Sequence, residues 1–526
     1  MIAGMDLVDI RYMLQYQTVE KPDCYPFKSG VYIMSVIFAI ILIATGYNEA
    51  RTEIISQSDI GVELTSEEMT VELIFEKLKD DATALQDPWN PWVSQFFPCV
   101  REEYENTDLY EFLQDMPKGA ILHVHPSAMG NYFTLFDQVS VREDCYFHPA
   151  TQSFMLFMDS VPGDGWLSVP GILSSADDET VLRDSLINCI TIDPGDADLP
   201  DIWAEFERMF GRVGGLFSDP AVAYNYVYQA LYDYAVMDNV QHIELRAHAP
   251  SPESVEFYLG VIDSLAKQGV DISIRIVYCD SRYIFPGETV DDFRSRITNS
   301  MKAAADLMNQ YPGIVVGADV YSEEDKGATA MYMAPMMQEA REYSLAEYGF
   351  ELPLFLHDGE SSFPTGVPDS PVSLLGPYPG DVNNNVIDAF LLNVQRVGHG
   401  IELAKLPGLA EMYALEGIPL EICPVSNQIL GYVSDLRNHP AVPLMRSGVR
   451  ISINPDDPAM FGYTGVTFDF VAATLAWDLS LAEVKGLIIN SIEDAAMTDA
   501  EEAELMSSWQ AEWDMFISDA AGTGDR

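Results

Sequence analysis

The sequence predicts an α/β protein built on a (β/α)₈ barrel with an N-terminal helical extension and a long insert after the first strand. Short β-rich runs recur from residue 119 onward, and most of the spacers between them hold an amphipathic helical stretch. The runs are AILHVH (120–125), HIELRA (242–247), ISIRIVY (272–278), IVVGADV (314–320), LPLFLH (352–357), QRVGHG (395–400), IPLEIC (418–423) and VRISI (449–453). Strand–helix alternation favours a parallel sheet, and eight such units favour a closed barrel.

Charge excludes two classes of partner. The 526 residues include 82 Asp and Glu but only 28 Lys and Arg, which gives a formal net charge of −54. Nucleic acids and anionic membrane surfaces are bound through clustered Lys and Arg, so neither is an expected ligand. Hydrophobic residues make up 48% of the chain, which is enough for a large folded core.

The first 50 residues are predicted to be a leader. Residues 31–47, VYIMSVIFAIILIATGY, are uncharged and apolar, and Lys28 precedes them. This length is near the lower limit for a membrane span and long for the core of a signal peptide. We therefore expect a signal or an uncleaved anchor, with the barrel secreted or facing the lumen or the outside. Two alternatives remain open, namely a true start at Met34 and a buried helix.

Between the leader and the barrel, residues 51–118 are predicted to form a helical extension. Thr65 and Glu68 match a capping box, and the residues that follow have helical apolar spacing. The barrel is expected to cover 119–518, with 519–526 as a tail.

The first spacer, 126–241, is too long for one crossover. We expect an inserted subdomain at about 126–200, irregular and rich in Pro and Gly, followed by helices. Cys145 and Cys189 flank much of this insert. They could form a disulfide in an exported protein, and buried free thiols are an equally good interpretation.

Polar residues at strand ends suggest a metal site. A barrel enzyme places its chemistry at the carboxyl ends of its strands, and four of the eight histidines fall there. The first strand ends in His123-Val124-His125, the fifth in His357, the sixth in His399, and the eighth leads into Asp456-Asp457. Three histidines and an aspartate suit a divalent ion such as zinc. Alone, an HxH is more often structural and a DD more often a turn. HExxH, CxxC, GxGxxG and Walker A patterns are absent.

These motifs resemble the metal-dependent adenosine deaminases, in order, from about residue 60 to 518. The matching segments are MPKGAILHVH (116–125), DNVQHIELRA (238–247), PLFLHDGES (353–361), RVGHGIEL (396–403), PLEICPVSNQIL (419–430), SDLRNHPAVPLM (434–445) and ISINPDDPAMFG (451–462). The branch that the chain resembles most is that of the secreted adenosine deaminase-related growth factors, or adenosine deaminase 2.

The resemblance implies a role for each matched residue. The ligands of one zinc ion per chain would be His123, His125, His357 and Asp456. Glu360 matches the glutamate that passes a proton at purine N1, and His399 matches the histidine that orients the attacking water. Asp457 matches the aspartate that binds N7. Asp358 departs from the pattern, because the family usually has Ala there.

The match to the family is less complete at the residues that would contact the substrate. The family usually has an Asp just after HxH that contacts the ribose 5′-hydroxyl, but here Pro126 and Ser127 follow, and Ser127 is the expected substitute. Ser322 stands where a Gly is usual, and its backbone N–H is expected to reach N3. Gly359 is expected to allow close approach of the backbone to the purine. Trp203 resembles a pocket-wall tryptophan, and a residue of the helix core is an equally good interpretation.

The expected reaction is zinc-dependent hydrolysis of adenosine and 2′-deoxyadenosine to the inosine nucleoside and ammonia. Another adenine nucleoside or AMP is the alternative substrate, although Arg246, Arg275 and Arg396 lie in or near strands and are expected to pair with buried acids. An alternative of another class is a growth-factor-like signalling protein on the same fold. The resemblance also implies a homodimer through the N-terminal helices and a cell-surface receptor bound by the insert.

Overall fold

A computed structural model describes residues 61–158, 162–362 and 384–523. The residues from Gly61 onward form one compact unit. Within the described ranges, no helix combines the length and the apolar character that crossing a membrane would need. The predicted leader segment 31–47 lies outside the described residues.

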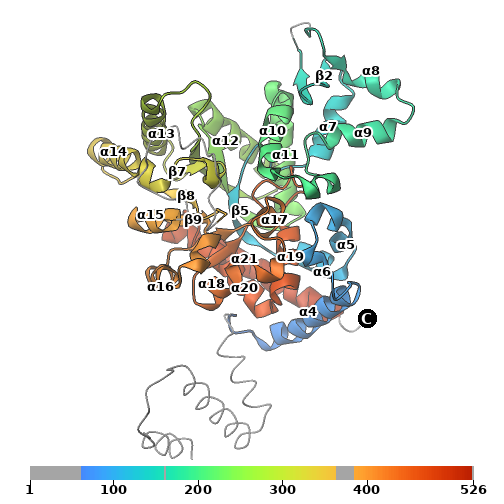
Figure 1. Ribbon diagram of the computed structural model, residues 1–526. Coiled ribbons are helices and arrows are strands. Elements are labelled where there is room, and N and C mark those ends of the chain that lie inside the picture. Colours follow the sequence, from blue (N-terminus) through green and yellow to red (C-terminus); the bar gives the residue numbers. More distant parts are fainter. Residues whose placement is uncertain (1–60, 159–161, 363–383, 524–526) are drawn as a thin grey trace, which may run out of the picture. The chain divides into compact units, whose positions relative to one another are not determined.

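Eight parallel strands form the predicted barrel (Figure 1). They are β1 (Gly119–Val124), β5 (Val240–His248), β6 (Ser273–Ser281), β7 (Val315–Tyr321), β8 (Phe355–Asp358), β9 (Arg396–His399), β10 (Leu420–Ile422) and β11 (Ile451–Ile453). They pair as two four-stranded sheets, β1-β5-β6-β7 and β11-β10-β9-β8. Single parallel bridges, Ala318 to Leu354 and Val124 to Asp456, join the sheets at both edges. The two sheets therefore meet at both edges, and each predicted run overlaps one strand.

Helices alternate with these strands, as the spacers predicted. Those between β5 and β11 are α12 (Pro252–Ala266), α13 (Val290–Gln310), α14 (Ala330–Tyr348), α15 (Asn385–Leu391), α16 (Pro407–Glu416), α17 (Pro424–Ile429) and α18 (Ala441–Arg446). The closing helices are α19 (Thr467–Trp477), α20 (Leu481–Glu493) and α21 (Asp499–Thr523). Side-chain caps define several of the starts. Thr289 and Asp292, for example, form a capping box at α13.

Short 3₁₀ helices fill several connections. They are η1 (Trp92–Ser94), η2 (Phe97–Cys99), η3 (Pro194–Asp198), η4 (Leu216–Ser218), η5 (Glu324–Lys326), η8 (Ile401–Lys405) and η9 (Leu436–Asn438). Of these, η5 follows β7 directly and lies beside the site described below.

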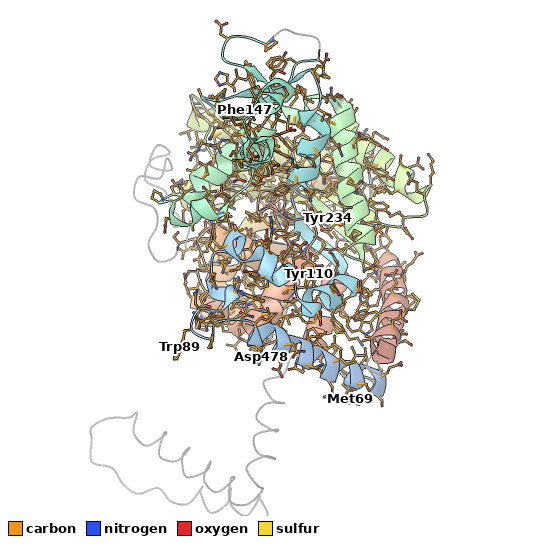
Figure 2. All side chains as sticks on the ribbon, turned by 90° about the vertical axis from the view of Figure 1, so that its right-hand side faces the viewer. Met69, Trp89, Tyr110, Phe147, Tyr234 and Asp478 are labelled. Carbon is orange, nitrogen blue, oxygen red and sulfur yellow. The ribbon has the colours of Figure 1, made fainter. Side chains whose placement is uncertain are left out.

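The extension before the barrel is helical, with α4 (Ser66–Ala84), α5 (Arg101–Glu105) and α6 (Asp108–Asp115). The predicted capping box is present, since Thr65 Oγ1 accepts from the Glu68 N–H and the Glu68 carboxylate accepts from the Thr65 N–H. Glu68 also accepts from Lys485 Nζ and Trp513 Nε1, both at 2.6 Å. One buried carboxylate thus fastens α4 to the two last helices. Figure 2 shows the outer face of this region, where Met69 and Trp89 are 54% and 93% exposed.

Glu68→Ala is expected to lower the free energy of unfolding by about 3 kcal/mol at pH 7, because it leaves Lys485 buried without its partner. Burial alone would raise the Glu68 pKa, but the bonds from Lys485, Thr65 and Trp513 lower it to about 2. The stabilisation is therefore complete above the ordinary value of 4.5 and is lost as the pH falls toward 2. Denaturant unfolding at several pH values measures this. Exposed Glu67 in the same turn, changed to Ala, is the control.

The insert differs from the irregular segment that was predicted. After α7 (Tyr132–Ser140), it holds a three-stranded antiparallel sheet ordered β3 (Ser153–Leu156), β2 (Cys145–His148), β4 (Leu167–Ser168). Two helices follow, α8 (Val169–Ser174) and α9 (Glu179–Ile187). Strands this short carry little sequence signal, which is why they were missed. Cys145 and Cys189 are free thiols.

Two helices, α10 (Ile202–Val213) and α11 (Pro220–Val236), return the chain from the insert to β5, as predicted. Figure 1 shows α7, α8, α9 and β2 grouped at the upper right, with α10 and α11 between them and the strands. One face of α10 thus reaches the carboxyl ends of the barrel strands, where the cavity described next lies.

Candidate active site

A cavity of about 600 Å³ opens at the carboxyl ends of the barrel strands. Its lining includes most of the predicted site residues, namely His125, Ser127, Trp203, Ser322, His357, Glu360, His399, Asp456 and Asp457. His123 lies fully buried beside them, and Gly359 does not line the cavity. Residues as far apart in the sequence as His123 and Asp457, 334 positions, are therefore brought to one place by the barrel.

Three histidines and one aspartate form a compact cluster at the base of the cavity. The His123 ring centroid lies 4.4 Å from that of His357 and 5.6 Å from that of His125. Asp456 Oδ1 lies 3.5 Å from His123 Nε2 and 3.4 Å from His125 Nε2. His123 Nε2 is buried and has no hydrogen-bond partner in the described chain. An inward-facing, unpaired imidazole nitrogen in such a donor set fits a bound divalent metal.

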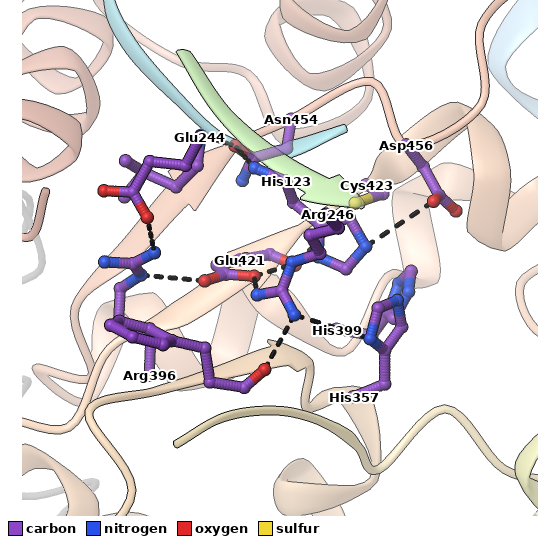
Figure 3. Close-up of polar contacts among 12 residues, drawn as sticks. His123, Glu244, Arg246, His357, Arg396, His399, Glu421, Cys423, Asn454 and Asp456 are labelled. Atoms are coloured by element: carbon purple, nitrogen blue, oxygen red, sulfur yellow. Dashed lines mark hydrogen bonds and ion pairs between the residues drawn. The ribbon is translucent and has the colours of Figure 1, made fainter. Parts of the chain in front are cut away.

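Two buried carboxylates orient these imidazoles, and Figure 3 shows one of them, Glu421, bonded to His123. His123 Nδ1 lies 2.9 Å from Glu421 Oε2, and His357 Nδ1 lies 2.6 Å from Asp319 Oδ2. Because each carboxylate accepts the Nδ1 proton, the Nε2 lone pair is left free for a metal. Burial lowers the pKa of His125 to about 3 and that of His357 to about 4. The rings of His125 and His357 are thus neutral at pH 7, as metal ligation requires.

Buried arginines balance these carboxylates, as predicted for Arg246 and Arg396. The Arg246 guanidinium pairs with Asp319 and Glu421. Arg396 pairs with Glu421 and with Glu244 on β5. Arg275 differs, because its partner Glu501 is 44% exposed. The charge under the cluster is therefore neutralised inside the barrel, and the Arg246 side chain is committed to this role.

Asp319→Asn is expected to weaken metal binding by about 10- to 100-fold, the usual scale for such an outer partner. The amide would present a donor to His357 Nδ1 and so favour the tautomer that carries its proton on Nε2. Titration with a competing chelator measures the affinity. Asp280→Asn is a matched control, since Asp280 is a buried aspartate on neighbouring β6 that binds Arg296 and Ser300 instead. An unchanged metal affinity in the Asp319 variant would contradict the assignment.

A buried carboxyl and a buried imidazole face the cluster. Glu360 Oε1 accepts from Asn427 Nδ2 at 2.7 Å and lies 3.2 Å from His399 Nδ1. Burial, followed by the nearby charges of Asp456 and Glu324, raises the pKa of Glu360 well above its usual range. Burial and His123 lower the pKa of His399 far below its usual range. The site can therefore hold a protonated acid beside a neutral base, which is the pairing that general acid–base chemistry needs.

Asp457 presents a free acceptor or donor to the cavity. Its Oδ1 is buried and has no hydrogen-bond partner in the described chain. Burial, together with the charge of Asp456, raises the pKa of Asp457 well above its usual range. Such a group is costly to bury unpaired, so its presence suggests that a ligand supplies the missing bond.

The predicted substrate-contacting residues are placed unevenly. Trp203 on α10 lines the cavity and packs edge-on against Phe206 at 5.4 Å between centroids. Ser322 has a φ of +93° and its hydroxyl lies 2.8 Å from that of Ser281. The Gly359 N–H donates to Glu324 Oε2 at 2.9 Å.

The need for glycine at position 359 comes from packing. Gly359 has a φ of +87°, and a Cβ there would lie 2.5 Å from Val386 Cγ1. A side chain at this position would therefore collide with Val386 of α15, and the approach of the purine to Gly359 stays a prediction.

Several residues in or next to the cavity wall were not predicted from the sequence. His248 Nδ1 lies 3.0 Å from the hydroxyl of Tyr321, and both residues line the cavity from the ends of β5 and β7. The predicted second strand ended at Ala247, whereas β5 ends at His248. A strand longer by one residue would have placed His248 at a strand end, among the candidate site residues. Asn427 was part of a matched motif without a stated role. His439 Nε2 lies 3.2 Å from the Oδ1 atom of Asn427. The Nδ2 group of Asn427 therefore faces Glu360.

An eight-stranded parallel barrel with this histidine and carboxylate cluster is typical of metal-dependent hydrolases. Residues 381–511 match the family model described as adenosine deaminase. The chain is 30% identical over 452 residues to adenosine deaminase 2-A of Danio rerio, and the match spans 81% of this chain and 84% of that protein. It is 29% identical over 499 residues to adenosine deaminase 2 of Dictyostelium discoideum, and this match spans 90% of this chain and 87% of that protein. The chain therefore belongs to the adenosine deaminase family.

Solved structures agree on the fold. An amidohydrolase from Burkhoderia ambifaria with bound zinc has a TM-score of 0.50 at 18% identity, covering 79% of this chain and 95% of that one. The N6-methyl-AMP deaminase from Arabidopsis thaliana has a TM-score of 0.50 at 17% identity, and the match covers 76% of this chain and 98% of that one. At these identities the likeness concerns the barrel alone.

Proposed function

We propose that this protein hydrolyses adenosine and 2′-deoxyadenosine to the corresponding inosine nucleoside and ammonia, with one zinc ion held by His123, His125, His357 and Asp456. The observation that carries the proposal is the buried Glu360 carboxyl, with its raised pKa, beside neutral His399 and the histidine cluster. The family membership supports the reaction, and the unpaired His123 Nε2 supports the metal.

Each side chain has one task in this mechanism. A zinc ion in the cluster would lower the pKa of a water molecule to about 7 and so supply a nucleophile at neutral pH. Glu360 donates its proton to purine N1, which makes C6 electrophilic. His399 is neutral and accepts a proton from the attacking water. That proton goes on to the 6-amino nitrogen as the C6–N bond breaks, so that ammonia leaves. Asp457 forms a hydrogen bond at N7, which satisfies its buried Oδ1.

The cavity wall favours a neutral nucleoside over AMP. Arg246 is the one Lys or Arg that lines the cavity in the described chain, and Asp319 and Glu421 already neutralise it. Glu207 adds a further carboxyl to the wall. A phosphate would find no free cation there. We propose that Trp203 packs against the nucleoside and that Ser127 and Ser322 contact it.

The test is absorbance change with adenosine, 2′-deoxyadenosine and AMP measured in parallel on protein of known zinc content. The expected result is turnover of the two nucleosides and little turnover of AMP. A preference for AMP would overturn the substrate assignment. Absence of turnover with all three, at full zinc occupancy, would overturn the proposed reaction and favour the signalling alternative.

We propose that α4 contributes to a homodimer interface. Met69 and Leu73 lie one turn apart on this helix and are 54% and 72% exposed, and Trp89 beyond its end is 93% exposed. Burying such side chains against a second copy would remove apolar surface from water. The insert is proposed to bind a cell-surface receptor, and its exposed Val141 and Val181 offer apolar contacts.

We propose that residues 31–47 direct export of the chain. Residues 1–50 fused to a reporter are expected to carry it out of the cytosol, because the apolar run is of the length that translocation machinery recognises. Fractionation of cells measures the distribution. The matched control is a fusion of residues 1–30, which lacks the run. A reporter that remains in the cytosol with both fusions would contradict the proposal.

A further inference from the structure

The end of β8 carries two of the proposed functional groups within four residues. His357, in the metal cluster, and Glu360, the proposed acid, are separated by Asp358 and Gly359. Two charged side chains, which follow strands β6 and β7, hold this segment. Arg282 follows β6 and is fully buried, and Glu324 follows β7 and is 2% exposed.

Glu324 binds the backbone of the turn with both carboxylate oxygens. Its Oε2 accepts from the Gly359 N–H at 2.9 Å, and its Oε1 accepts from the Glu360 N–H at 2.7 Å. Asn385 Nδ2 donates to Oε2 at 2.7 Å from the other side. Although Glu324 lines the cavity, its oxygens are therefore occupied by protein donors. Charge-assisted bonds of this kind are stronger than those between neutral groups.

Arg282 holds the same segment at the preceding residues. Its Nη2 donates to the His357 carbonyl and, at 3.1 Å, to Asp358 Oδ1. Its Nη1 lies 3.7 Å from Glu324 Oε2, so the two charges partly neutralise each other. The chain makes room for the arginine at Gly327, where a Cβ would lie 2.5 Å from Arg282 Cγ and Cδ. The pair thus contacts every residue from 357 to 360.

We propose that Arg282 and Glu324 are positioning residues that fix the Glu360 carboxyl relative to the metal cluster. The proposal rests on the function proposed above. A buried ion pair is weak evidence for stability alone, because desolvation offsets much of its attraction. Its bonds here go to the one turn that links a metal ligand to the acid. A displacement of about 1 Å in such a turn is enough to lower turnover by about 10²-fold.

Glu324→Gln tests the role of the carboxylate. The amide keeps one acceptor oxygen but turns an NH₂ donor toward a backbone N–H, so one of the two bonds to the turn is lost. The expected result is a fall in kcat of about 10- to 100-fold. Zinc per chain and KM for adenosine should stay within about twofold of the parent protein, since the metal ligands are unchanged and Gln keeps the size of Glu in the cavity wall.

Glu483→Gln is the matched control. Glu483 is also a buried glutamate that accepts a backbone bond, from Ser480 N at 2.9 Å, but it caps α20 away from the cavity. Its variant should lose thermal stability without a change in kcat per folded chain. Arg282→Lys is the second test variant, because one ammonium cannot reproduce the planar guanidinium, whose Nη2 reaches His357 and Asp358 while its Nη1 lies beside Glu324. It should lower kcat as well.

Three readouts decide the matter on the same samples: folded fraction, bound zinc, and kcat with KM. A kcat within threefold of the parent in folded, zinc-loaded Glu324→Gln would overturn the inference. A loss of kcat that merely follows lost zinc, or that Glu483→Gln shares, would overturn it too. If the parent protein turns over no nucleoside, the proposed function itself fails, and that outcome is distinct from a variant that stays active.

Discussion

Replacing His357 by alanine is expected to remove most of the bound zinc and to lower adenosine turnover by orders of magnitude. His357 Nδ1 is held by Asp319 at 2.6 Å, and the ring lies against that of His123 at 4.4 Å between centroids. Its Nε2 therefore faces the cluster. Without it, two histidines and Asp456 remain to hold the ion, and the fixed geometry that a catalytic site needs is lost.

Metal analysis after gel filtration, together with turnover on the same sample, measures the effect of this change. His242→Ala is the matched control, because His242 is a fully buried histidine on β5 whose Nδ1 lies 2.8 Å from Ser273 Oγ, outside the cluster. The control should keep its zinc even if its stability falls. Full zinc occupancy with near-normal turnover in the His357 variant would refute the assigned ligand set.

The barrel could be predicted because its signal is local and repeated. Each strand is a short β-rich run bounded by turn residues, and parallel strands bring all their carboxyl ends to one side. Once the runs were placed, His123, His357 and Asp456 had to converge, whatever the spacing between them in the sequence. The family resemblance supplied what periodicity cannot, namely which polar residue would perform which step.

Other features arise from packing between distant segments, which leaves no local pattern. The pairing of Arg282 with Glu324 links residues 42 positions apart, and both lie just beyond strands, in segments read as connections. The packing of Val386 against Gly359 likewise joins two segments that no local pattern relates. The small sheet of the insert was missed because alternation over two to four residues cannot be told from chance.

Glu360→Gln is expected to keep zinc and the affinity for inosine but to lose about 10²-fold or more in turnover, the usual scale for a general acid. Gln is nearly the same size as Glu, and its oxygen can still accept from Asn427, which lies 2.7 Å from Glu360 Oε1. It can also donate a hydrogen bond to purine N1, but it cannot transfer a proton. Binding and catalysis should therefore separate in this variant.

The dependence on pH gives the same experiment a second readout. Because burial raises the pKa of Glu360, its carboxyl is protonated below that raised value and loses its proton as the pH rises through it. Turnover of the parent protein should accordingly fall on the alkaline side, and the residual turnover of Glu360→Gln should lack that fall. If Glu360 were only a structural partner of Asn427, Gln would cost about 1 kcal/mol of stability and little activity. Turnover within a few-fold of the parent, with zinc intact, would thus show that the proton reaches N1 from another group.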